Sequence, residues 1–163
     1  MKINKTFFAF IVAICAMTLF GVALVVNNLH GTNEFRDSLT VSSDGTEFEK
    51  SFKGFDLVPG KSVEYVIDMT MQQSGDYKLS LVFGNLEGTG LDQYLDATIT
   101  FGDDELKKVK LENLLASEKI EHNFTADEKE LKSLKIVYSM DIDVGKECAG
   151  KTASFDMVLT VER

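Results

Sequence analysis

The sequence predicts an all-β protein, an antiparallel β-sandwich of jelly-roll or immunoglobulin-like type with one or two short helices, preceded by an N-terminal hydrophobic helix. Apolar and polar residues alternate with a period of two from residue 38 onward, which is typical of strands with one buried and one wet face. Turn-forming residues separate the alternating runs. A long apolar run without charges precedes them.

That apolar run, residues 7–26, is twenty residues long and can span a hydrocarbon core as a helix. Lys2 and Lys5 precede it, so the positive-inside rule predicts that the rest of the chain is exported. Two interpretations are open. Residues 21–23 (Gly-Val-Ala) form a small-x-small site, which favours a signal peptide cleaved after Ala23. Leu24-Val25-Val26 continue the apolar run, which favours an uncleaved anchor.

We therefore divide the chain into 1–26 as signal peptide or signal anchor, 27–37 as linker or donor-strand segment, and 38–163 as the sandwich domain. Cys15 falls in the first part, so Cys148 is the single cysteine of the exported body. No disulfide can then form within the body. We expect Cys148 to be a partly buried apolar residue; an intermolecular bridge or a reactive thiol is the alternative.

The body contains five clear alternating runs and two shorter candidates, which predict seven or eight antiparallel strands in two packed sheets. The clear runs are 63–71, 77–83, 95–101, 136–140 and 155–161, and the shorter ones are 39–42 and 47–55. The segments 43–45, 58–60, 73–76 and 102–104 have the composition of turns.

Helix is expected only in the connections. Residues 108–119 (KVKLENLLASEK) place Leu111, Leu114 and Leu115 near helical spacing, which predicts a short surface helix crossing between the sheets. Residues 125–128 (Thr-Ala-Asp-Glu) have the spacing of a capping box and predict another helical turn.

The charge balance limits the partners. The chain has 26 acidic and 17 basic residues, for a net charge of −9. Residues 1–23 hold two lysines and no acid, so the remainder carries 15 basic and 26 acidic residues, net −11. Binding to phosphate backbones requires clustered lysine and arginine, so we expect no nucleic-acid partner.

The residues predict no catalytic, cofactor or metal site. The chain has two histidines, His30 and His122, and neither belongs to an H-E-x-x-H motif. His122 alternates with Ile120 and Phe124, so we interpret it as a half-buried structural residue. There is no G-x-S-x-G motif, and the glycine-rich stretch 84–90 lacks the lysine of a phosphate loop.

Two weaker signals remain. The acidic segments 103–105 and 141–143 could supply oxygen ligands to calcium, but solvated turns explain them better. Asn4 and Asn123 each begin a glycosylation sequon, a pattern short enough to arise by chance.

Two stretches resemble the TasA/camelysin-like family, exported β-sandwich proteins of Gram-positive bacteria processed by a signal peptidase of the W type. The first is 55–83 and the second is 135–163. Lys146 and Ala149 depart from the family's usual asparagine and glutamine. The matching residues are Leu57, Pro59, Gly60, Ser62, Val144, Gly145, Gly150, Phe155, Asp156, Val158 and Thr160.

The resemblance implies a non-enzymatic cell-surface or biofilm-matrix structural protein, secreted or on the extracellular face of the membrane or wall. It also implies fibres formed by donor-strand exchange, with Leu24–Val26, Leu29 and Phe35 as the natural donor. The expected partners are further copies or other matrix subunits, the signal peptidase during export, and the membrane through residues 7–26 if these are uncleaved. A membrane-anchored monomeric accessory or binding module is the alternative. A camelysin-like metallopeptidase is the third, suggested only by a family label.

Overall fold

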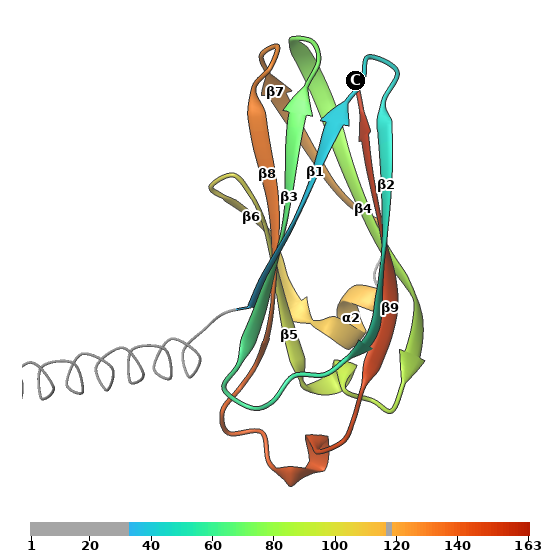
Figure 1. The fold of residues 1–163 in the computed structure, drawn as a ribbon, viewed down its shortest axis with the longest axis vertical. Coiled ribbons are helices and arrows are strands. Elements are labelled where there is room, and N and C mark those ends of the chain that lie inside the picture. The colour runs from blue at the N-terminus through green and yellow to red at the C-terminus, as the bar shows by residue number, and fades with distance from the viewer. Residues whose placement is uncertain (1–32, 117–118) are drawn as a thin grey trace, which may run out of the picture. The chain divides into compact units, whose positions relative to one another are not determined.

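The computed structural model describes residues 33–116 and 119–163, in which two β-sheets pack face to face (Figure 1). The five-stranded sheet has the order β1-β3-β8-β5-β6, and the four-stranded sheet has the order β2-β9-β4-β7. The strands are β1 (Asn33–Val41), β2 (Thr46–Phe55), β3 (Ser62–Met71), β4 (Gly75–Gly88), β5 (Leu95–Phe101), β6 (Asp104–Lys110), β7 (Ile120–Ala126), β8 (Leu131–Met140) and β9 (Ala153–Glu162). A mostly antiparallel sandwich with little helix is confirmed.

One strand pair departs from the expected antiparallel arrangement. β1 pairs with β3 in parallel, in a register that runs from Asn33 opposite Val63 to Val41 opposite Met71. After β1 a tight turn carries the chain into the other sheet as β2, and the next loop returns it as β3. The chain reverses direction twice between β1 and β3, once before β2 and once after it. Because β2 lies in the opposite sheet, β1 and β3 run in the same direction and can pair in parallel (Figure 1).

The N-terminal boundary of the sandwich also differs from the expectation. β1 begins at Asn33, so the last five residues of the expected linker 27–37 already pair with β3. The expected hydrophobic helix 7–26 and the cleavage position after Ala23 lie outside the described residues. Within residues 33–116 and 119–163, no helix is long and apolar enough to cross a membrane.

The expected helix 108–119 is wrong in its bounds. Lys108 and Lys110 end strand β6, and helix α2 is limited to Leu111–Leu115. The lysines alternate with Val109, and Lys110 forms an ion pair of 3.0 Å with Asp96 on the neighbouring β5, so strand pairing replaces the first helical turn.

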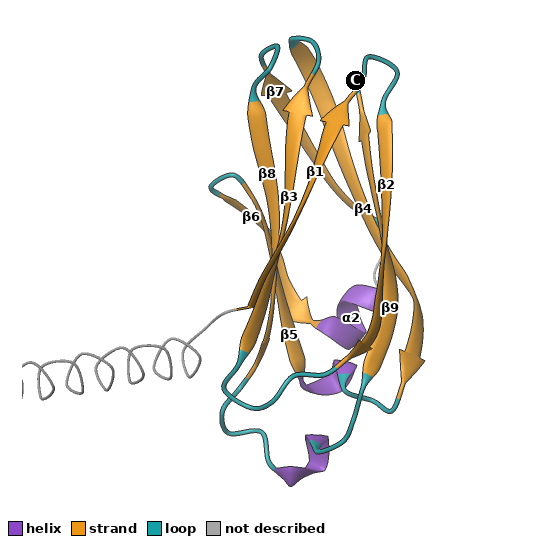
Figure 2. Cartoon of the chain, in the orientation of Figure 1, coloured by secondary structure: helices purple, strands orange, loops and turns teal. Residues whose placement is uncertain are grey.

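The expected position of this helix between the sheets is confirmed. α2 packs against β5 of one sheet and β4 of the other, and it buries Leu111 and Leu114 (Figure 2). Two short 3₁₀ helices, Asp92–Tyr94 and Lys146–Cys148, complete the helical content of the described residues.

The helical turn expected at 125–128 is absent. β7 continues to Ala126, and the Thr125 hydroxyl donates a hydrogen bond of 2.9 Å to Asp76 on β4 instead of capping a helix. The Asp127 N–H donates to the Glu130 carboxylate at 2.8 Å, which closes a turn before β8. A short turn forms here in place of a helix, because the residues on both sides belong to strands β7 and β8.

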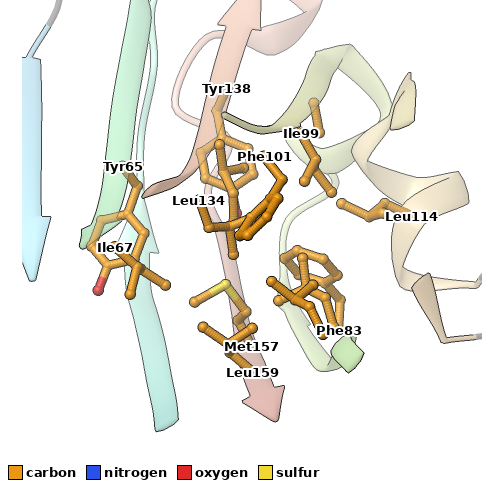
Figure 3. Close-up of a cluster of buried hydrophobic side chains, with 14 of the residues drawn as sticks. Tyr65, Ile67, Phe83, Ile99, Phe101, Leu114, Leu134, Tyr138, Met157 and Leu159 are labelled. Carbon is orange, nitrogen blue, oxygen red and sulfur yellow. The ribbon is translucent and has the colours of Figure 1, made fainter. Parts of the chain in front are cut away.

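The core lies between the sheets and is built from the inward-facing residue of each alternating pair (Figure 3). An aromatic group occupies one part of it. The Phe52 and Phe155 rings stack with centroids 4.9 Å apart, and Phe52 meets the edges of Tyr65 and Tyr138 at 5.3 and 5.8 Å. These contacts join β2 and β9 to β3 and β8, so the two sheets share one core.

Candidate functional site

Strand β1 is the feature of the sandwich that is best suited to an interaction. Among the described strands it stands at the end of its sheet, so one side of its backbone has no strand partner. It is also the parallel strand of an otherwise antiparallel sandwich. Unpaired backbone at a sheet edge is a template for another chain, so how this strand is held matters.

Burial along β1 falls steadily toward its N-terminal end. Its inward face consists of Val41, Leu39, Asp37 and Phe35. Val41 is fully buried and Leu39 packs against the core, whereas Phe35 is 57% exposed. The C-terminal half of β1 is therefore anchored by apolar packing, and the N-terminal half is not.

The N-terminal half is held on its inner face by Asp37. The Tyr65 hydroxyl of β3 donates a hydrogen bond to the Asp37 carboxylate, and the Lys50 ammonium of β2 lies 2.9 Å from the same carboxylate. Lys50 also lies over the Tyr65 ring, 5.2 Å from its centroid. The hydrogen bond from Tyr65, and then that from Lys50, lowers the pKa of Asp37. Burial and the Asp37 contact raise the pKa of Tyr65.

The same half of β1 is held on its outer face by Asp68 of β3. The Arg36 guanidinium donates to the Asp68 carboxylate at 2.6 Å and to the Glu34 carboxylate at 2.8 Å. The Ser133 hydroxyl of β8 donates to the other Asp68 oxygen at 2.6 Å. The hydrogen bonds from Ser133 and then Arg36 lower the pKa of Asp68.

An apolar groove of about 300 Å³ opens beside this half of β1, between β1 and β3 on one side and β2 on the other. Its apolar walls are Phe35, Phe52, Phe55, Val63 and Tyr65, and its polar rim is Lys50, Ser51 and Lys53. The groove has the chemistry to receive apolar side chains of an added strand.

The structure does not bring the histidine and the sequon asparagine of the described residues together into one site. His122 has a side chain that is 22% exposed, with its ring 5.2 Å from Phe101 and its Nε2 3.8 Å from Asp104. This half-buried packing agrees with a structural residue. His30 and Asn4 lie outside the described residues, and Asn123 is exposed on the end strand β7.

Both acidic segments are exposed, but only one of them is a turn. Asp103 lies in the turn between β5 and β6, whereas Asp104 and Glu105 begin strand β6. In 141–143 the Asp143 N–H donates to the Asp141 carboxylate at 2.8 Å. Within the described parts of the chain, no group of three or more His, Cys, Asp or Glu side chains is placed to hold a metal ion. The glycine-rich stretch 84–90 forms the end of β4 and the turn after it.

Cys148 is 6% exposed, and its thiol donates to the Gly145 carbonyl at 3.2 Å. It lines a hollow of about 490 Å³ between the β2–β3 and β8–β9 loops, together with Leu57, Pro59 and Val144. Its burial agrees with a small apolar residue.

Sequence reasoning missed the contact between Asp37, Lys50 and Tyr65. The signal was present, because Asp37 occupies the apolar phase of the alternation Phe35, Asp37, Leu39, Val41. A charge in that phase indicates either a solvent-exposed end or a partner across the sandwich.

No family model matches the sequence, and no curated protein matches it. Solved structures similar to this chain include the following two. The pre-peptidase C-terminal domain of a collagenase from Bacillus anthracis is 14% identical, with a TM-score of 0.38, over 81% of this chain and 99% of that one. PliG of Aeromonas hydrophila, a periplasmic inhibitor of g-type lysozyme, is 8% identical, with a TM-score of 0.37, over 79% and 99%. Similarity at this level carries no functional argument.

Proposed function

We propose that this chain is an exported, non-enzymatic structural protein of the cell surface or biofilm matrix, which self-associates by exchanging strand β1 between copies. Residues 7–26 direct the export, and the domain is a jelly-roll or immunoglobulin-like sandwich of the TasA/camelysin-like type. The observation that supports exchange is that β1 is a parallel end strand with its N-terminal half outside the apolar core.

Exchange preserves the contacts of β1. If β1 of one copy pairs with β3 of the next, the register from Asn33 to Val41 and the backbone hydrogen bonds are reproduced between molecules. Phe35 then lines the groove of the neighbouring copy, as it lines the groove of its own chain in the single molecule. Because each copy gives a strand to one neighbour and receives one from another, the contact is head-to-tail and builds filaments unless it closes into a ring.

The first experiment determines which form of the chain is exported and then tests whether that form makes fibres. The mass of the chain recovered from the outside of expressing cells shows whether residues 1–23 are removed. This exported form is then imaged by electron microscopy beside a variant that lacks residues 24–36. We expect the exported form to give fibres and the deletion to abolish them; unchanged fibres would contradict a donor role for this segment.

A disulfide lock tests exchange of β1 directly. Thr40 and Thr70 are register partners on β1 and β3, so the double change Thr40→Cys and Thr70→Cys, made with Cys148→Ala, can tie β1 to its own chain. The matched control ties Thr98→Cys on β5 to Val137→Cys on β8, in the same sheet but away from β1.

We expect the oxidised β1 lock to form no fibres and to regain them on reduction, while the control forms fibres in both states. Fibres from the oxidised β1 lock would exclude exchange of β1 as the mechanism.

A further inference from the structure

We infer that Asp37 and Asp68 form a two-sided latch, and that neutralising both carboxylates releases the N-terminal half of β1, Asn33–Ser38, while the rest of the sandwich stays folded. The inference deepens the proposed function, because the released half uncovers the Val63–Asp68 part of the β3 edge, at which exchange of the whole strand would begin.

The inner contact joins β1 to both sheets. Asp37 receives hydrogen bonds from Tyr65 of its own sheet and from Lys50 of the opposite one, and its side chain is 35% exposed. Neutralising Asp37 leaves the Lys50 ammonium facing inward beside the aromatic ring of Tyr65, with its counter-ion removed. This charge then favours a more open arrangement of β1 and β2.

The outer contact joins β1 to β3 and β8. Asp68 is the more buried partner, with its side chain 15% exposed, and it receives hydrogen bonds from Arg36 and Ser133. Neutralising Asp68 removes the charge that holds Arg36. Arg36 keeps its contact with Glu34, but Glu34 lies on β1 itself and does not tie the strand down.

One neighbouring pair acts in the opposite sense. Glu34 lies opposite Glu64 of β3, so acid also removes a repulsion between these strands. Glu64 is already compensated by Lys135 at 3.5 Å, and Glu34 by Arg36 at 2.8 Å. The repulsion is therefore weaker than the two attractions, and the net effect of neutralisation is release.

The limit of release is set by packing. Leu39 and Val41 remain in the core when the carboxylates are neutral, because their contacts are apolar. Detachment therefore stops near Ser38, and the turn into β2 stays in place. The pKa values of Asp37 and Asp68 are both lowered by the folded contacts, so acid releases the strand only as the pH falls below about 4.

Hydrogen exchange, measured by mass spectrometry on the full chain in an uncharged detergent, tests the latch. The double variant Asp37→Asn and Asp68→Asn keeps the side-chain shapes and removes the charges. At pH 7 we expect residues 33–38 to exchange about tenfold faster in this variant than in the natural chain, with β9 unchanged. The natural chain at pH 3, corrected for the intrinsic exchange rate, should show the same pattern.

The matched control is Glu121→Gln with Asp156→Asn. The pKa values of these two carboxylates are also lowered by their partners, but Glu121 and Asp156 lie on β7 and β9 of the other sheet. We expect no loosening of β1 in this control. Equal loosening in both double variants, or none in the Asp37 and Asp68 variant, overturns the inference.

If the double variant also loses protection in β9, the two single variants replace it. Failure of both to speed exchange of residues 33–38 by about threefold then overturns the latch. The proposed function can fail separately from the latch. If residues 33–38 exchange faster in the Asp37 and Asp68 variant but the exported form makes no fibres, only the exchange of β1 is contradicted. If the Thr40–Thr70 lock blocks fibres but residues 33–38 do not exchange faster in that variant, only the latch is contradicted.

Discussion

The Lys50 ammonium of β2 lies 2.9 Å from the Asp37 carboxylate of β1, so one ion pair joins the end strands of the two sheets. Both side chains sit on the inward faces of their strands, where alternation otherwise places apolar residues. Inward-pointing charges are a known means of keeping sheet edges from pairing at random. This pair therefore connects the two sheets at the side where their end strands β1 and β2 face each other.

The ion pair predicts a pH-dependent contribution to stability. The folded pKa of Asp37 is lowered, so its contribution is present above the unfolded value near 3.9 and is lost as the pH falls through the folded value. Both side chains are more than a third exposed, so we expect Asp37→Asn to lower the free energy of unfolding by only about 0.5 to 1 kcal/mol at pH 7. Urea unfolding at pH 7, 5 and 3 checks this; a difference that persists at pH 3 would argue against the charge as its cause.

Two tyrosines of the aromatic group should respond in opposite ways to loss of their hydroxyl. The Tyr138 hydroxyl is buried without a hydrogen-bond partner among the described residues, whereas the Tyr65 hydroxyl donates to Asp37. We expect Tyr138→Phe to leave stability unchanged or to raise it by about 1 kcal/mol, and Tyr65→Phe to lower it by about 1 kcal/mol. Parallel thermal and urea unfolding of both variants measures the contrast. A larger loss for Tyr138→Phe would show that its hydroxyl has a partner.

The end of β4 depends on a glycine. Gly88 has a φ of +137°, and a Cβ there would lie 2.4 Å from the Thr152 carbonyl oxygen of the neighbouring strand connection. We expect Gly88→Ala to cost about 2 kcal/mol or more, since both backbone strain and the clash oppose it. Gly84→Ala, four residues earlier on the same strand with open space around its Cβ, should cost less than about 1 kcal/mol. Similar urea midpoints for the two variants would contradict the predicted clash.

Cys148 should be protected in the folded chain. Because it is 6% exposed, we expect a thiol reagent to label it slowly under native conditions and rapidly in denaturing urea. Labelling followed by intact mass measures both rates, with Cys148→Ala as the blank for the exported form. Native labelling as fast as that of the unfolded chain would favour the alternative of a reactive or bridging thiol.

The sequence predicted the architecture best where one face of a strand is buried. β5 was placed at its observed bounds, β3 to within one residue and β9 to within two residues at either end, because each alternates regularly between core and solvent. β6 was mistaken for the start of a helix because Leu111 and Leu114, which follow it, do have helical spacing. The choice depended on the pairing of Lys108 and Lys110 with β5, which is a tertiary contact.

The parallel pairing of β1 and the latch around it could not be predicted from local pattern. Period-two alternation defines which residues face inward but not which strand lies alongside. Asp37 interrupts the apolar phase visibly, yet its partners Lys50 and Tyr65 are 13 and 28 positions away and come from different sheets. Only the arch from β1 to β2, followed by the return to β3, brings them together.

Replacing Phe35 tests the contact between copies with little effect on the stability of the single chain. Its side chain is 57% exposed beside the groove, so Phe35→Ala should change the free energy of unfolding by less than about 0.5 kcal/mol. If β1 is exchanged, the same ring lies against the groove of the next copy with the same partial exposure, so its loss should slow fibre formation about twofold. Leu131→Ala is the matched control, because Leu131 is 59% exposed at the start of β8 and away from the groove. Fibre growth followed by light scattering and electron microscopy should be reduced for Phe35→Ala and unchanged for Leu131→Ala.

Equal growth of the natural chain and both variants would mean that Phe35 makes no contact between copies. Equal slowing in both variants would indicate association through general surface hydrophobicity.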